Sequence, residues 1–193
     1  MICYKENMSI PVESVAAWIQ SRCADAAGMK LQKLLYYGQA WHLAWEGQLL
    51  FQERLEAWAQ GPVSPHVFGA LRHEGALASQ RLPPEAITTL EAVLQAYGDR
   101  SGRWLSELTH REAPWRAARA GLPDEAPSKA EISIELMRRT YGSHKYGTGK
   151  QFSQEYLRGL ELMVELPIEE LELLEKTVDS ESTLRWLETG IEE

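Results

Sequence analysis

Histidines are the first residues of this sequence that could do chemistry, either as metal ligands or as acid–base catalysts. They are His42, His66, His73, His110 and His144. A zinc-protease helix needs two histidines four residues apart with a glutamate between them, and no pair here has that spacing. The two cysteines, Cys3 and Cys23, complete no Cys/His zinc pattern. The sequence therefore predicts no metal site.

A glycine-rich stretch, Tyr141 to Lys150 (YGSHKYGTGK), could cradle a phosphate group. A P-loop requires G-x-x-x-x-G-K-[ST] after a strand. Gly142 and Gly147 have the right separation, but Thr148 stands where the lysine belongs, and the preceding segment has a helical pattern. The stretch therefore favours a linker, and we expect no nucleotide or other cofactor.

Two pairs of side chains could be catalytic, one as a paired acid and base and the other as a Thr-His pair. Glu53 and Glu56 lie three residues apart, and Thr109 precedes His110. Two glutamates at this spacing usually face solvent, and no G-x-S-x-G nucleophile motif is present. We expect no catalytic residue and no enzymatic activity. The rival interpretation is a small hydrolase that uses His110 with a nearby acid.

Helices must position these residues, because apolar stripes at helical spacing run through most of the chain. Val12, Val15, Ala16 and Ile19 form the first stripe. A second helix from about Met29 to Trp45 buries its leucines and tryptophans, with Lys30 and Lys33 expected to point away from the core. Further helices are expected after Ser64-Pro65 with Val67, Phe68 and Leu71 inward, after Pro83, after Ser101, at Pro114, and after a capping box of Ser128 and Glu131.

The fold class that follows is mainly α. Residues 1–142 are expected to form one compact helical domain, and Gln48 to Gly61 permits a minor β element, with Gly61-Pro62 as a turn. Residues 143–150 are the predicted linker, and residues 151–193 are the predicted acidic helical extension. The N-terminus is not a secretory signal, and no apolar run approaches the ~20 residues of a membrane span. We therefore expect a cytoplasmic location and no membrane partner.

The net charge of −8 is unevenly distributed. Leu160 to Glu193 contains eleven acidic residues against two basic ones, a net of −9, and residues 1–159 carry +1. Such a segment is either a solvated helical face or a surface that attracts a basic partner by electrostatic steering. A group of arginines from Arg100 to Arg119 lies beside Trp104 and Trp115, but Asp99, Glu107 and Glu112 dilute it. Nucleic acid is therefore the less favoured partner.

Three blocks together carry a family resemblance. They are LQKLLYY at Leu31 to Tyr37, Ala57-Trp58 followed by Gly61-Pro62-Val63, and LSELTHREAPW at Leu105 to Trp115. In this order and spacing, over about Val12 to Tyr141, the chain resembles the Panacea domain of SocA-like antitoxins. The family often has tyrosine before Gly-Pro-Val, where this chain has Gln60. The motif residues are Leu31, Gln32, Lys33, Leu34, Leu35, Tyr36, Tyr37, Trp58, Gly61, Pro62, Val63, Thr109, His110, Pro114 and Trp115.

The resemblance implies an antitoxin that neutralises a cognate protein toxin, usually encoded by a neighbouring gene, through direct binding. Some relatives act as adaptors that present the toxin to a protease. A regulator that binds the DNA of its own operon is a further alternative. The resemblance carries no toxin-contact residues. The acidic extension offers Leu171, Leu174 and Trp186 as candidate toxin contacts, because large apolar anchors dominate interface energy. Leu31, Leu34 and Leu35 are expected in the core, and Tyr36 and Tyr37 in the core or at a contact.

Overall fold

The computed structural model describes residues 10–73, 77, 79–123, 125–142 and 150–167 of the 193-residue chain. In this part of the chain the fold is mainly helical, as predicted, with eight helices and one two-stranded sheet. The helices are α1 (Val12–Arg22), α2 (Gly28–Glu46), α3 (Pro65–His73), α4 (Pro84–Tyr97), α5 (Gly102–Arg111), α6 (Ala113–Arg119), α7 (Ile134–Gly142) and α8 (Gln154–Glu165). The strands are β1 (Glu56–Trp58) and β2 (Gly61–Val63).

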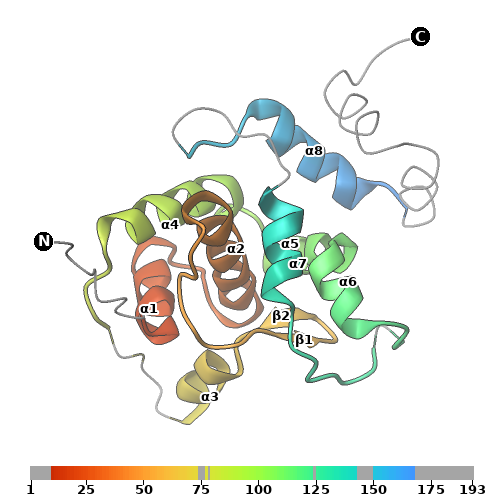
Figure 1. Cartoon of the computed structure of the whole chain (residues 1–193), viewed down its shortest axis with the longest axis horizontal. Helices are drawn as coiled ribbons and strands as arrows, with labels where there is room; N and C mark the ends of the chain where they lie inside the picture. The colour runs from red at the N-terminus through yellow and green to blue at the C-terminus, as the bar shows by residue number, and fades with distance from the viewer. Residues whose placement is uncertain (1–9, 74–76, 78, 124, 143–149, 168–193) are drawn as a thin grey trace, which may run out of the picture.

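Helix α2 lies at the centre of the domain (Figure 1). Helices α1, α4, α5 and α7 pack around it, together with β2. The β hairpin and α3 lie at one end of the molecule and α8 at the other, as Figure 1 shows. Among the described helices, none is long and apolar enough to cross a membrane.

Local sequence signals explain several of the helix ends. Ser101 and Ser153 accept hydrogen bonds from the backbone N–H groups of Trp104 and Tyr156, and so cap α5 and α8. Gly47 ends α2 in the left-handed conformation at φ 69°, which glycine adopts without a steric penalty. The predicted caps at Ser64 and Ser101 are confirmed, since Ser64 Oγ accepts from Val67 N at 3.4 Å.

The capping box predicted at Ser128 and Glu131 is wrong. Residues 130–132 instead run alongside β1, where Ala57 N donates to Ala130 O and Ile132 N donates to Leu55 O. Helix α7 begins later, and Ser133 Oγ accepts from Leu136 N. Pairing of residues 130–132 with the edge of the hairpin prevails over the local capping signal. This pairing gives hydrogen-bond partners to backbone N–H and C=O groups that would have none at a helix end.

The minor β element is confirmed, but the predicted turn at Gly61-Pro62 is wrong. Gly61 and Pro62 belong to β2, where Pro62 pairs with Ala57 and Gly61 pairs with Trp58. The turn is formed by residues 59–60. Pro62 is tolerated there because a proline can occupy an edge position that needs no backbone donor.

Helix α8 packs loosely on the opposite end of the domain. Phe152 and Tyr156 meet the ring of Trp41 edge-on, with centroid distances of 4.8 and 5.5 Å. Leu160 is the buried residue of α8. Arg111 donates hydrogen bonds to the carbonyl oxygens of Val164 and Leu166, so it holds the C-terminal end of this helix.

Candidate functional site

The first motif block forms the most deeply buried part of α2. Leu31, Leu34 and Leu35 are core residues, as predicted. Tyr36 and Tyr37 are also fully buried, so the choice between core and contact is settled in favour of the core. An apolar face this wide explains why α2 takes the central position in the fold.

The prediction that Lys30 and Lys33 point away from the core is wrong. Both side chains are buried, and only 1% of the surface of Lys33 is exposed. Lys30 Nζ forms a 2.7 Å ion pair with Asp25, and the N-terminal end of α5 lies so close that a Cβ on Gly102 would be 3.1 Å from the backbone N of Lys30. Neighbouring elements therefore cover α2 on the sides that its own periodicity leaves polar.

Side chains from the first and third motif blocks hold the backbone of the hairpin, which carries the second block. Lys33 Nζ donates to Pro62 O at 3.2 Å, and Gln32 Oε1 accepts from Ser64 N at 2.8 Å. The indole N–H of Trp115 donates to Trp58 O at 3.0 Å. Three further side-chain bonds reach the hairpin and the segment beside it: Ser106 Oγ to Gln60 O, Arg119 Nη1 to Ala57 O, and Gln39 Nε2 to Phe51 O.

Gly61 is required by close packing in this network. Its φ is +94°, in the region that favours glycine. A Cβ added there would lie 2.5 Å from Lys33 Cε and 2.7 Å from Thr109 Oγ1. The glycine of the second block thus makes room for the lysine of the first and the threonine of the third, which links the three blocks in space.

A buried glutamate is the main feature that the sequence did not reveal. Glu112, between α5 and α6, accepts hydrogen bonds from the hydroxyls of Tyr141 at 2.7 Å and Tyr37 at 3.3 Å. The Tyr141 hydroxyl also lies 3.1 Å from that of Tyr36. Burial raises the pKa of Glu112 to about 7, against the lowering effect of the tyrosine hydroxyls. The sequence shows Glu112 only as an acid that dilutes the group of arginines from Arg100 to Arg119.

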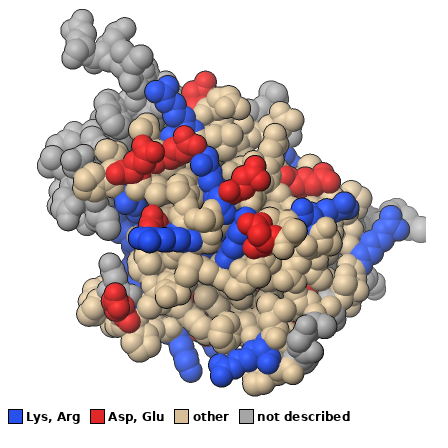
Figure 2. Space-filling model, turned by 180° about the vertical axis from the view of Figure 1, so that it is seen from behind, with Lys and Arg blue, Asp and Glu red and all other residues tan. Residues whose placement is uncertain are grey.

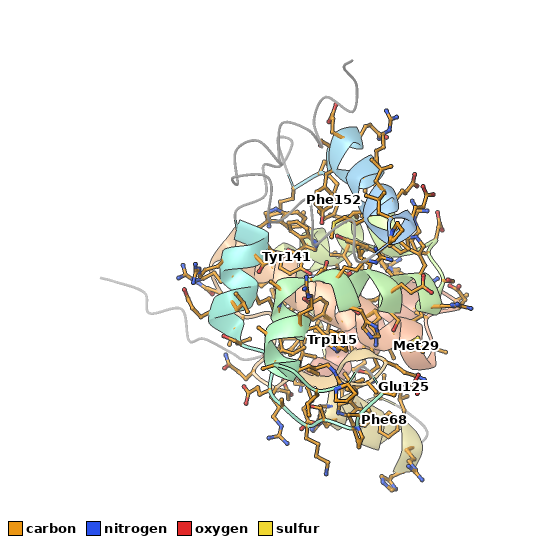
Figure 3. The ribbon with its side chains drawn as sticks, turned by 90° about the vertical axis from the view of Figure 1, so that its right-hand side faces the viewer. Met29, Phe68, Trp115, Glu125, Tyr141 and Phe152 are labelled. Carbon is orange, nitrogen blue, oxygen red and sulfur yellow. The ribbon has the colours of Figure 1, made fainter. Side chains whose placement is uncertain are left out.

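The aromatic cluster continues from this glutamate toward α8. The rings of Tyr37 and Tyr97 stack at 4.2 Å with an interplanar angle of 7°. The Tyr97 hydroxyl accepts from the indole N–H of Trp41 at 3.1 Å and lies 2.9 Å from the hydroxyl of Tyr156. Figure 3 shows Tyr141 below Phe152 at this end of the molecule. Buried hydroxyls that bond one another fix the packing of α2, α4, α7 and α8.

Thr109 and His110 have structural partners. The Thr109 hydroxyl donates to Ser106 O inside α5. The His110 ring stacks on Trp115 at 4.0 Å, and Pro114 is buried in the first turn of α6. This arrangement stabilises the α5–α6 junction and gives no sign of a nucleophile paired with a base.

The remaining candidates are dispersed or already engaged. Glu56 is buried, paired with Arg54 and bonded to the Trp58 indole, and Glu53 accepts from Val12 N. His42 Nδ1 lies 3.1 Å from Thr89 Oγ1, and burial lowers its pKa to about 4. The described residues contain no group of three His, Cys, Asp or Glu side chains that could hold a metal ion. Leu171, Leu174 and Trp186 lie outside the described residues.

Most of the arginines from Arg100 to Arg119 are used within the molecule. Arg100 pairs with Glu161, Arg103 pairs with Glu107, and Arg119 is buried and donates to backbone carbonyls. Figure 2 shows one face on which Lys and Arg alternate with Asp and Glu rather than gathering by sign. This distribution lacks the single-sign stripe of a typical nucleic-acid interface.

Replacing Lys33 with methionine should change how stability depends on pH. Burial lowers the pKa of Lys33 from 10.5 to about 7, so between these values the unfolded chain binds a proton that the folded chain does not. The free energy of unfolding therefore rises with pH in this window, by roughly 3 kcal/mol between pH 7 and 9.5. Urea denaturation of wild type and Lys33→Met at both pH values measures the effect. Equal pH dependence in the two proteins would contradict it.

Comparison with known families agrees with this geometry. Residues 31–116 match the family described as Antitoxin SocA-like, Panacea domain. The match begins at the first residue of the LQKLLYY block and ends one residue after Trp115, so it spans all three blocks and the hairpin that they hold. No curated protein and no solved structure matches the chain. Over residues 31–116 the chain is thus similar to the Panacea domain of SocA-like antitoxins.

Proposed function

We propose that this protein is an antitoxin that neutralises a cognate protein toxin by binding it directly. The observation that carries the proposal is the family match over residues 31–116, since SocA-like Panacea domains are antitoxin-like and typically non-catalytic. The contacts of the motif residues support it. Four of these residues hold or pack against the hairpin: Gln32, Lys33, Gly61 and Trp115. Glu112 accepts a hydrogen bond within the aromatic core. These residues stabilise the fold of the domain, and the toxin is bound by other surfaces.

The first toxin-binding surface that we propose is the C-terminal acidic segment, residues 168–193. This segment has nine acidic residues against two basic ones, a net of −7, and includes Leu171, Leu174 and Trp186. Many toxins act on nucleic acids or nucleotides, and such sites are basic. Glutamates could cover a basic site while the leucines and Trp186 fill apolar pockets beside it, which is how a few buried anchors dominate an interface.

Truncation after Pro167 should abolish neutralisation without unfolding the domain. The cut keeps Phe152 and α8 with its Tyr156, and both of these rings pack on Trp41. Removing residues 151–193 would uncover the Trp41 ring. We expect toxin affinity to fall at least a hundredfold, because two or three anchors each contribute about 2 kcal/mol. Growth rescue and thermal unfolding of the truncated chain measure function and folding separately. Full rescue by the truncated chain would place the toxin-binding surface within residues 1–167.

A matched variant tests the anchors without shortening the chain. Leu171→Ser with Leu174→Ser and Trp186→Ala keeps every charge of the segment, and a second variant with Glu169, Glu170, Glu172 and Glu175 changed to glutamine keeps every anchor. Loss of rescue in the first variant assigns toxin binding to apolar contacts. A loss of rescue that is confined to the second variant, with toxin binding restored at low salt, assigns toxin binding to charge.

Co-expression with the protein encoded by the neighbouring reading frame tests the proposal as a whole. Cells that express this reading frame alone should stop growing, and cells that also express the chain should grow. Rescue that disappears in the absence of a host protease, with the toxin then persisting, would instead indicate a proteolytic adaptor. A salt-sensitive gel shift on the operon's own promoter would support the regulatory alternative.

A further inference from the structure

The outer face of α3 carries an apolar side chain that the fold does not bury. Phe68 was expected to point inward, but 41% of its surface is exposed, and Leu122 is the other large hydrophobic residue of the described chain that is similarly exposed. Val67 and Ala70 supply the buried face of this short helix. Figure 3 shows Phe68 at the opposite end of the molecule from Phe152. An exposed aromatic ring on an ordered helix is a common feature of protein-binding surfaces.

Trp58 of β1 gives this ring a rigid support. The rings of Trp58 and Phe68 meet edge-on with centroids 5.0 Å apart, and Trp58 is itself only half-buried. Its indole N–H donates to Glu56 at 2.8 Å, and its carbonyl oxygen accepts from Trp115. The motif network that holds the hairpin therefore also fixes the Trp58–Phe68 pair, and a preorganised aromatic pair loses little entropy on binding.

Gly69 lies beside Phe68 and has no role inside the molecule. It stands within α3 at an ordinary helical φ, and a Cβ added there would meet no atom of the described residues within 4 Å. Glycine inside a helix costs about 1 kcal/mol relative to alanine. Neither backbone conformation nor internal packing accounts for it, whereas a partner whose backbone comes close to α3 would.

The last turn of α3 is basic. Helix α3 contains no acidic residue, and Arg72, four residues after Phe68, is exposed together with His73. Residues four apart lie on the same side of a helix, so Arg72 adjoins the Phe68 ring. Arg54, 60% exposed, forms a 2.7 Å ion pair with Glu56 next to Trp58, so its charge is offset there. The complement of this face is an apolar side chain flanked by carboxylates.

We infer that the outer face of α3, formed by Phe68, Gly69 and Arg72 with Trp58 beside it, is a docking site for the protein partner, through an apolar anchor of that partner bordered by acidic residues. This inference rests on the proposed antitoxin function and names a second surface of the chain that meets the toxin. In this complex the Trp58–Phe68 pair contacts the apolar anchor of the partner, and Arg72 orients the partner through its acidic residues.

The test titrates the purified full-length chain with the purified product of the neighbouring reading frame. Phe68→Ala, Arg72→Glu and Gly69→Gln should each raise the Kd at least tenfold. The control is Gly159→Gln on α8, another helical glycine with no atom within 4 Å of an added Cβ, which should leave the Kd within twofold of wild type. Thermal unfolding separates binding from folding, because Gly69→Gln should keep or raise the unfolding temperature.

Each outcome decides the inference. Wild-type binding that all three α3 variants retain within twofold overturns it and leaves the antitoxin function standing. A wild-type chain that neither binds nor neutralises this protein overturns both. A Kd raised equally by Gly159→Gln overturns it, since the effect would then not belong to α3. A wild-type dimer that Phe68→Ala converts to a monomer also overturns it, because the face would then bind a second copy of this chain.

Discussion

Gly61→Ala should destabilise the protein by roughly 3 kcal/mol, as the sum of a strained left-handed backbone and an overpacked contact. The φ of +94° disfavours any side chain, and the new Cβ would lie 2.5 Å from Lys33 Cε and 2.7 Å from Thr109 Oγ1. Lys33 cannot swing into solvent to make room, because it is buried and bonded to Pro62 O. The midpoint of thermal unfolding should fall by about 6–12 °C for a chain of this size.

Gly69→Ala is the matched control, because that glycine lies in a helix with open space around it. Its unfolding temperature should stay level or rise. A double variant, Lys33→Ala with Gly61→Ala, tests the steric part of the cost. If the contact with Lys33 matters, the second change costs less in the Lys33→Ala background than in wild type. A Gly61→Ala protein as stable as wild type would contradict the proposed packing of the three blocks.

Glu112→Ala should be similarly damaging, at about 3–4 kcal/mol. The substitution opens a cavity and leaves the hydroxyls of Tyr37 and Tyr141 without their acceptor in the core. Glu112→Gln keeps the shape and one carbonyl acceptor, so it should cost far less. Denaturant titration of both variants at pH 7.5 measures the difference. Equal and small losses would show that the tyrosine hydroxyls find other partners.

The pH dependence of Glu112→Gln follows from the raised pKa. The folded protein holds a proton on Glu112 up to about pH 7, whereas the unfolded chain releases it near 4.5, so the contribution of Glu112 to stability falls as pH rises between these values. His42 acts in the opposite direction, since its pKa is lowered to about 4. The informative quantity is therefore the free energy of unfolding of wild type minus that of Glu112→Gln. This difference should decline by roughly 3 kcal/mol from pH 4.5 to 7.5.

The helices and their apolar faces could be predicted from the sequence because they depend on local pattern. The stripe of Val12, Val15, Ala16 and Ile19 is buried as predicted, and the caps at Ser64 and Ser101 lie where expected. The antitoxin-family resemblance was carried by motif order and spacing, and the family match confirms it over residues 31–116.

The misplaced residues are those whose environment is set by distant segments. Lys33 is buried because the hairpin, some thirty residues further along the chain, supplies a carbonyl for its ammonium group. Glu112 is buried because Tyr37 and Tyr141 arrive from α2 and α7. Phe68 is exposed although its helical stripe is apolar, since α3 is short and only Val67 and Ala70 are fully buried, with Leu71 partly buried beside them. Periodicity shows that a face is apolar, but it does not show which element covers it.

The most direct test of the antitoxin account is calorimetric titration of the purified full-length chain with the purified product of the neighbouring reading frame, in an inactivated form if the active one is toxic. The account predicts a saturable complex of fixed stoichiometry, with affinity high enough to persist through size-exclusion chromatography. It also predicts that the residues which weaken this complex are those whose substitution ends growth rescue. Growth rescue without any complex, or a complex without rescue, would contradict neutralisation by direct binding.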